Sequence, residues 1–384
     1  MLNKRLRVLI VANQDWFFLS HRLPLAHAIR TAGAEVVVVA GDSGKASAIR
    51  AEGFEFVAMP ISRKGVNPVR ELHTLRFLRR TYRRLQPDLV HHVTIKPVLY
   101  GSIASQLVGG MAVVNAISGL GYVFASSDVR AKALRPLIRV IYRLALSDPR
   151  SRTLFQNPDD LNDFVRMGLV RSSQAVLIRG SGVNCATFHP TPEPAGRPLV
   201  VLASRMLWDK GVKEFVEAAR LIRAEDESPR FVLAGTPDFG NPGAIAVTQM
   251  QAWSSEGAVE WWGQRNDMPA VLAQSSVVVL PTMYGEGVPK ILLEAAAAGR
   301  PIVATDVRGC REIVRPGING MLVAPGNGTE LANAIRVLLE SRDLRERFGR
   351  AGREIAVAEF AEETVVRRTL DVYRDLLGAS ALLK

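Results

Sequence analysis

The sequence predicts an α/β protein made of two doubly wound, Rossmann-like domains that face a cleft. Short apolar runs recur along the 384 residues and alternate with stretches of helical periodicity. A segment rich in proline interrupts this alternation once, and the same pattern then starts again. Apolar runs without a polar alternation are typical of parallel strands that are buried on both faces, which is the sheet of a doubly wound fold.

The first half of the chain contains seven candidate strands. They lie at residues 7–12, 35–40, 54–59, 89–93, 112–117, 153–156 and 175–178. Gly33 and Gly53 each fall just before one of these strands, where a preceding helix tends to end. We therefore expect residues 1–186 to form the first domain.

The linker between the domains is predicted at residues 187–198, because four prolines in twelve residues exclude a helix or a central strand. The second domain then occupies residues 199–360. Its candidate strands lie at 199–203, 230–234, 259–261, 277–280, 301–304 and 321–323. Residues 361–384 follow as a C-terminal helix that either closes the second domain or crosses back to the first.

Composition limits the class of protein. The two cysteines, Cys185 and Cys310, fit no metal-binding spacing and no disulfide framework, which favours a reducing compartment and hence the cytoplasm. No apolar run is long enough to span a membrane. Residues 1–190 carry 26 Lys and Arg against 12 Asp and Glu, a net charge of +14, whereas residues 191–384 carry 23 against 25, a net charge of −2. The first half should therefore bind polyanions such as an acidic membrane surface, a nucleic acid or a phosphorylated substrate.

Two helices of the first half combine arginines with an apolar stripe. In residues 69–85 and 129–146 the apolar residues recur at intervals of three and four residues, as on one face of a helix. In the second segment Arg135, Arg139 and Arg143 are spaced four residues apart and therefore share another face. Such a helix lies either on an anionic membrane surface, as we expect here, or simply in solvent.

A pair of glutamates marks the first candidate site. Glu286 and Gly287 lie in a loop after the apolar strand 277–280, Pro289 suits the first turn of the helix that follows, and Glu294 lies inside that helix. Loop amides and a helix N-terminus bind phosphate, whereas carboxylates accept hydrogen bonds from sugar hydroxyls. The alternative is that Glu286 caps the helix and Glu294 is merely exposed.

A second candidate site follows the strand 199–203. Arg205 and Lys210 lie at its carboxyl end, where doubly wound sheets bind their ligands. Two cations there suit a diphosphate leaving group, although they can also be ordinary surface charges.

Together these residues resemble the family-four retaining glycosyltransferases of GT-B fold. That family has an Arg and a Lys after the first strand of the C-terminal domain, and then two glutamates separated by seven residues. Gly182-Val183-Asn184, with Phe188 and Pro190, is similar to the family's segment before the linker, and residues 316–320 to its late loop. His91-His92 with Lys96, together with the segments 118–124 and 286–290, is similar to the bacterial α-1,3-N-acetylgalactosaminyltransferases that extend a sugar linked to diphospho-undecaprenol.

The chain departs from the family pattern at three places. Val288-Pro289 replaces the usual Phe-Gly, residues 13–21 replace a glycine-rich loop, and Ser118 replaces a histidine. A role taken from that histidine therefore does not transfer to this chain.

The resemblance implies a retaining, metal-independent transfer from a UDP-sugar, such as a UDP-N-acetylhexosamine, to a saccharide linked to polyprenyl diphosphate, on the inner face of the cytoplasmic membrane. No cofactor is expected, and the chain has no Asp-x-Asp motif to hold a metal. Glu286, Arg205 and Lys210 are the expected catalytic residues. The expected donor-binding residues are Arg205, Lys210, Glu286, Gly287, Val288, Lys290 and Glu294. The expected acceptor-binding or cleft residues are His21, His92, Lys96, Ser118 and Tyr122.

Two other functions fit a chain of two such domains. A non-hydrolysing UDP-sugar epimerase would act without an acceptor, and a non-catalytic binding protein would show no turnover. No nucleic-acid recognition motif, no GxGxxG after the first strand and no Walker A motif occur in the sequence, so we expect neither a nucleic-acid partner nor a nicotinamide cofactor.

Overall fold

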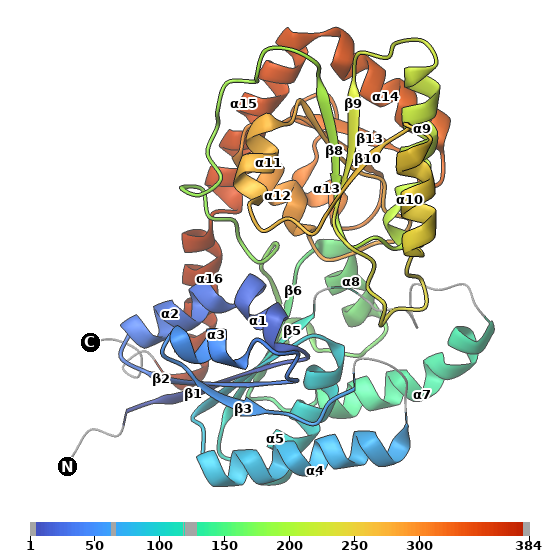
Figure 1. The fold of residues 1–384 in the computed structure, drawn as a ribbon. Coiled ribbons are helices and arrows are strands. Elements are labelled where there is room, and N and C mark those ends of the chain that lie inside the picture. The colour runs from blue at the N-terminus through green and yellow to red at the C-terminus, as the bar shows by residue number, and fades with distance from the viewer. Residues whose placement is uncertain (1–4, 63–66, 118, 120–128, 379–384) are drawn as a thin grey trace. The chain divides into compact units, whose positions relative to one another are not determined.

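The protein, seen here as a computed structural model, forms two compact units (Figure 1). The structure describes residues 5–62, 67–117, 119 and 129–378, with the backbone alone for 129–134. Unit 1 comprises Met1–Ser181 and Glu363–Lys384, and unit 2 comprises Gly182–Glu362. Each unit has its own parallel sheet covered by helices, as predicted.

The sheet of unit 1 has the strand order β3-β2-β1-β4-β5-β6-β7, and every pairing in it is parallel. Its strands are β1 (Arg7–Ala12), β2 (Glu35–Ala40), β3 (Glu55–Ala58), β4 (Leu89–Val93), β5 (Ala112–Ile117), β6 (Ser151–Phe155) and β7 (Ala175–Leu177). The strand order reverses direction between β1 and β4, which is where a doubly wound sheet opens a ligand crevice at its carboxyl edge.

Helices cover both faces of this sheet. One face carries α1 (Asp15–His21), α2 (Leu23–Thr31), α3 (Ala46–Ala51) and the C-terminal α16 (Glu362–Leu377). The other face carries α4 (Pro68–Leu85) and α5 (Ser102–Val108), and α7 (Val129–Ala145) and α8 (Pro158–Arg166) pack near β5 and β6. Two short helical turns, η1 (Pro97–Gly101) and η2 (Ser172–Gln174), complete the described part of the unit.

The C-terminal helix belongs to unit 1. Val365, Val372 and Tyr373 of α16 are buried in the same cluster as Val8 and Ile10 of β1. The sequence left two placements open for this helix, and in the structure the helix crosses back to the first domain.

The division between the units falls at Gly182, five residues before the predicted linker. The Val183 amide donates to the Phe360 carbonyl at 2.9 Å, and the Arg353 guanidinium donates to the carbonyls of Cys185 and Phe188 at 2.9 and 2.8 Å. These bonds fix the start of the proline-rich segment to unit 2, so residues 187–198 lie within that unit.

The sheet of unit 2 has the order β10-β9-β8-β11-β12-β13, again with parallel pairings. Its strands are β8 (Leu199–Ala203), β9 (Arg230–Ala234), β10 (Glu260–Gly263), β11 (Val277–Leu280), β12 (Ile302–Thr305) and β13 (Gly320–Val323). One face carries α9 (Val212–Arg223), α10 (Val247–Ser255) and α14 (Gly328–Glu340). The other face carries α11 (Met268–Gln274), α12 (Lys290–Ala297), α13 (Cys310–Ile313) and α15 (Arg342–Glu359). Here the order reverses between β8 and β11, the strands that precede the two candidate motifs.

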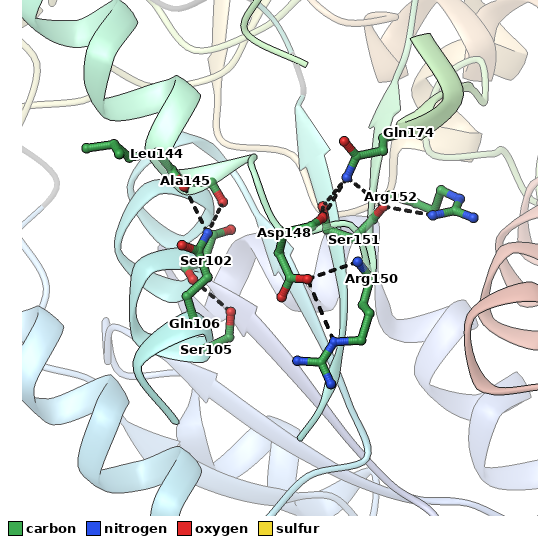
Figure 2. A network of polar contacts seen from close by, with 10 residues as sticks. All are labelled: Ser102, Ser105, Gln106, Leu144, Ala145, Asp148, Arg150, Ser151, Arg152 and Gln174. Carbon is green, nitrogen blue, oxygen red and sulfur yellow. Dashed lines mark hydrogen bonds and ion pairs between the residues drawn. The ribbon is translucent and has the colours of Figure 1, made fainter. Parts of the chain in front are cut away.

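The C-terminal end of α7 is fixed by side chains of unit 1 (Figure 2). The Gln106 amide donates to the carbonyls of Leu144 and Ala145 at 2.9 and 3.0 Å, and the Gln174 amide donates to the Asp148 carbonyl at 2.6 Å. The two Gln106 bonds satisfy carbonyls of the last turn of α7, which a helix end otherwise leaves unpaired, so this end has a defined position against α5.

Candidate active site

Two loops of unit 2 meet at the carboxyl ends of β8 and β11. The first contains the turn η3 (Trp208–Lys210), and the second runs from the end of β11 to Pro289. The Met283 amide donates to the Asp209 carbonyl at 2.8 Å, and the Thr282 hydroxyl oxygen lies 3.1 Å from the same carbonyl oxygen. The two motifs that the sequence predicts as separate sites are therefore parts of one site.

An ion pair joins these motifs. The Nζ atom of Lys210 lies 2.5 Å from Oε1 of Glu286, and the Thr282 hydroxyl donates to the same carboxylate oxygen at 2.9 Å. The Lys210 side chain is 13% exposed and that of Glu286 29% exposed. This partial burial orients both charged groups while leaving the carboxylate open to solvent, so Glu286 does not act as a simple helix cap.

Two glycines allow this close approach. A Cβ on Gly211 would lie 1.9 Å from the Pro281 carbonyl oxygen, and one on Gly309 would lie 1.7 Å from the Gly287 oxygen. Both residues also have positive φ, of 72° and 83°. A larger residue at position 211 would push the Lys210 loop away from the end of β11, and one at position 309 would push the segment before α13 away from the Glu286 loop.

Arg205 has a partner that the sequence analysis missed. Its guanidinium lies 2.9 Å from Oδ2 of Asp238, in the loop after β9. The Arg205 side chain is 44% exposed, whereas Asp238 is 14% exposed. No motif joins these residues, because only the parallel pairing of β8 with β9 brings their loops together.

Glu294 is a largely buried carboxyl group on α12. Its side chain is 12% exposed, and Lys290 lies 3.8 Å from it. Burial raises the pKa of Glu294 to about 7, the positive charge of Lys290 opposes this rise, and the negative charge of Glu362 adds to it. The alternative of an exposed Glu294 is therefore wrong. A buried carboxyl group whose pKa lies near neutrality is a common feature of ligand sites.

The segment between the glutamates differs in detail from expectation. Val288 is 6% exposed and packs in a core cluster with Leu292, so its side chain cannot face a donor. Only the main chain of Val288 is suited to that role. Gly287 is also buried, and Pro289 precedes α12 as its N-cap instead of lying in its first turn.

His92 does not face a cleft, and this expectation is wrong. It lies inside β4 and is fully buried, where its ring contacts the Tyr82 hydroxyl at 2.8 Å and Asn115 Oδ1 at 2.8 Å. Burial lowers the pKa of His92 to about 4, while the Asn115 hydrogen bond opposes the change. Its observed role is to join β4 to α4 and β5.

The other predicted acceptor residues are less buried. His21 ends α1, with Nδ1 2.6 Å from the Ser20 hydroxyl and its ring stacked on Phe17. Lys96 pairs with Glu71 at 2.6 Å and donates to the Ser62 carbonyl at 2.8 Å. Ser118 and Tyr122 lie outside the described residues.

The three arginines of α7 are not equivalent. Arg139 and Arg143 are exposed and Arg135 is half-buried. The Arg143 guanidinium donates to the carbonyls of Met167 and Gly168 at 2.9 and 3.2 Å, which satisfies the C-terminal end of α8. Arg143 therefore has a structural role whether or not it meets a membrane.

Within the described part of the chain, no helix is long and apolar enough to cross a bilayer. The same residues contain no group of three or more His, Cys, Asp or Glu side chains placed to hold a metal ion.

Comparisons with known proteins agree with this fold. Residues 7–157 match the model of the Glycosyl transferase 4-like family, and residues 197–341 match that of Glycosyl transferases group 1. The chain is therefore a glycosyltransferase of GT-B architecture. It belongs to the glycosyltransferases that join a 4-like domain to a group 1 domain.

Relatives span nearly the whole chain. The N,N'-diacetylbacillosaminyl-diphospho-undecaprenol alpha-1,3-N-acetylgalactosaminyltransferase of Campylobacter jejuni is 26% identical over 93% of this chain and 97% of its own. Among solved structures, sucrose-phosphate synthase from Thermosynechococcus elongatus has a TM-score of 0.80 at 20% identity, covering 98% of this chain and 100% of that one. HepE of Anabaena in complex with UDP has a TM-score of 0.77 at 18% identity, covering 96% and 100%. At these identities the two structures establish the fold alone.

Proposed function

We propose that this protein is a retaining, metal-independent glycosyltransferase that moves a sugar, in our view an N-acetylhexosamine, from a UDP-sugar to a saccharide linked to polyprenyl diphosphate. The observation that carries the proposal is the ion pair of Lys210 with Glu286, which brings a phosphate-binding cation and a hydroxyl-binding carboxylate to one point. The Campylobacter relative, which by its name acts on a diphospho-undecaprenol-linked sugar, supports the acceptor class.

The donor would change the partners of both cations. In the free protein Lys210 is paired with Glu286 and Arg205 with Asp238. A diphosphate carries more charge than a carboxylate and accepts bidentate hydrogen bonds from a guanidinium, so it competes well for both cations. Its arrival would leave the Glu286 carboxylate with acceptor capacity for hydroxyls of the transferred sugar.

The same groups would then stabilise the leaving group. As the bond between the sugar and the diphosphate breaks, negative charge grows on the diphosphate oxygens. Lys210 and Arg205, together with the N-terminal amides of α12, would stabilise that charge in a partly buried site where it is weakly screened. Glu294 would accept hydrogen bonds from the ribose hydroxyls, and its ionised form can accept them on both oxygens. In this scheme the leaving diphosphate accepts the proton of the acceptor hydroxyl, so no side-chain base is needed.

Because the proposed acceptor is anchored in a membrane, the enzyme would have to bind the membrane surface, and α7 would make this contact. Leu137, Val140 and Leu144 are 59%, 51% and 59% exposed, at helical spacing, while Ile138 and Ile141 pack inward. An exposed apolar ridge beside the exposed Arg139 suits shallow insertion into an anionic surface. We place this contact on the inner face of the cytoplasmic membrane, where the thiols of Cys185 and Cys310 would stay reduced.

A screen for UDP release tests the proposal. Nucleotide sugars would be supplied with and without short-chain polyprenyl-diphosphate saccharides, in chelator. Release that depends on the acceptor, with a product of unchanged anomeric configuration, is expected. An epimerase would instead convert the donor without an acceptor, and inversion or a strict need for a divalent ion would reject the proposed mechanism.

A further inference from the structure

Unit 1 buries a cation that has no ion-pair partner among the residues that the structure describes. Arg22, between α1 and α2, is 7% exposed, and burial lowers its pKa to about 10. One terminal nitrogen donates to the His21 carbonyl at 2.9 Å, whereas Nε is buried and makes no hydrogen bond. Across the described residues, no carboxylate forms an ion pair with this guanidinium. A buried charge without a counter-ion is strongly unfavourable, so the arrangement calls for an explanation.

A second unused donor lies close to Arg22. His91 is 1% exposed and points to the face of β4 opposite that of His92. Its Nδ1 lies 2.6 Å from the Tyr373 hydroxyl of α16, and its Nε2 is buried without a hydrogen-bond partner. Burial, the charge of Arg22 and the neighbouring His92 hold the pKa of His91 well below its ordinary value, so the ring is neutral. When the Tyr373 hydroxyl donates to Nδ1, the ring proton lies on Nε2, which is then a donor.

Both residues line one cavity within unit 1. It has a volume of about 30 Å³ and lies near the carboxyl ends of β5, β6 and β7, where Ile117, Gln156 and Ile178 complete its wall. A cavity needs only about 10–15 Å³ to hold one water-sized group, so this one has room for a small ligand.

We propose that this cavity is a binding site for a small inorganic anion, held by the Nε–H of Arg22 and the Nε2–H of His91. Two buried donors beside an uncompensated positive charge fit a halide ion or a phosphate oxygen, both of which accept hydrogen bonds and carry the missing negative charge. Water satisfies the hydrogen bonds but leaves the charge of Arg22 uncompensated. The residues that line the site all belong to unit 1, include none of the expected donor-binding residues, and do not depend on the proposed function.

Thermal unfolding in matched salts tests the site. Wild-type protein would be compared in sodium chloride, sodium phosphate and sodium gluconate at equal ionic strength, since gluconate is too large for the cavity. We expect a midpoint about 3 °C higher in chloride or phosphate than in gluconate. An effect of chloride identifies a halide site, and an effect of phosphate alone identifies a site for a phosphate group.

Two variants separate this effect from general salt effects. Arg22→Met should remove the difference between salts, because it removes the charge while keeping most of the volume. Arg30→Met, on the exposed side of α2, the helix that Arg22 precedes, should keep the difference. The proposal is overturned if Arg22→Met responds to the anions as wild type does, or if wild type shows no anion-specific rise.

A crystallographic measurement covers the case in which Arg22→Met does not fold. Wild-type crystals soaked in bromide should show an anomalous peak within hydrogen-bond distance of Arg22 Nε and His91 Nε2. Ordered side chains without such a peak, in crystals that show no bound phosphate there either, would also overturn the proposal.

Discussion

Lys210 and Glu286 lie 76 positions apart in the chain of unit 2 and form an ion pair of 2.5 Å in the free protein. The cation expected to bind the donor diphosphate is thus already paired with the carboxylate expected to bind the sugar. Under the proposed function, donor binding exchanges these partners at a preformed site, and the predictions for Lys210, Arg205, Asp238 and Glu286 rest on that exchange.

Removing either cation should weaken binding of UDP. Lys210→Met and Arg205→Met each delete a charge-assisted contact, which contributes about 1.5–3 kcal/mol, so the Kd for UDP should rise roughly 10-fold to 100-fold. Arg205 is 44% exposed, and its effect should therefore be the smaller one. Calorimetric titration measures both. The matched control is Lys213→Met, which changes an exposed lysine of α9. If Lys210→Met and Arg205→Met bind UDP as tightly as this control, the diphosphate binds elsewhere.

Asp238 should oppose donor binding. It competes with the diphosphate for Arg205, so Asp238→Asn should lower the Kd for UDP, by no more than about 10-fold because a partly exposed ion pair is weak. The same titration, repeated in Arg205→Met, should show no gain from the Asp238 change. A gain that persists without Arg205 would contradict the competition.

Ionisation of the buried Glu294 should lower the stability of the folded protein, while the ionised group contributes to UDP binding. Its pKa in the folded protein, about 7, is above its ordinary value of 4.5, so the folded state binds more protons between these values and loses stability as the pH rises through them. Glu294→Gln avoids ionisation. It should match wild type near pH 5 and be more stable near pH 8 by about 2 kcal/mol, while binding UDP less tightly. Denaturant unfolding at both pH values tests this, and equal destabilisation at both would show that Glu294 is only a packing residue.

The ridge of α7 should direct the protein to anionic membranes. Changing Leu137, Val140 and Leu144 to Asn removes three insertable side chains and should lower partitioning to anionic vesicles by about 100-fold. The matched control changes three similarly exposed apolar residues of unit 2, Leu221, Val337 and Val357, to Asn. Arg139→Glu should weaken binding mainly at low salt. Vesicle sedimentation measures the binding of both triple variants. If the α7 variant binds anionic vesicles as well as the unit 2 variant does, α7 faces solvent.

The sequence predicted the strands well because they are buried on both faces. The bounds of β1, β2, β4, β5, β8, β9 and β11 coincide with their apolar runs, and the others differ by one or two residues. The same double burial explains the error at His92. A histidine within an apolar run is fully buried in β4, with partners on α4 and β5 that no local pattern reveals.

The site was predicted only as far as local motifs extend. Arg205, Lys210, Glu286 and Glu294 stand in recognisable spacing, whereas Asp238 reaches Arg205 only through the pairing of β8 with β9. The burial of Arg22 and His91 depends on α16, which returns to unit 1 from the far end of the chain. Tertiary contacts of this kind leave no periodic or spacing signal in a single sequence.

The most direct test of the account measures both UDP affinity and sugar transfer in Glu286→Gln, beside the exposed control Glu340→Gln at the end of α14. The account predicts that the variant binds UDP at least as tightly as wild type, because Lys210 loses its competing carboxylate. It also predicts that transfer falls by at least about 100-fold, since contacts worth about 3 kcal/mol to the transferring sugar are lost. Transfer by Glu286→Gln at the rate of the Glu340→Gln control would contradict the central role given to this carboxylate.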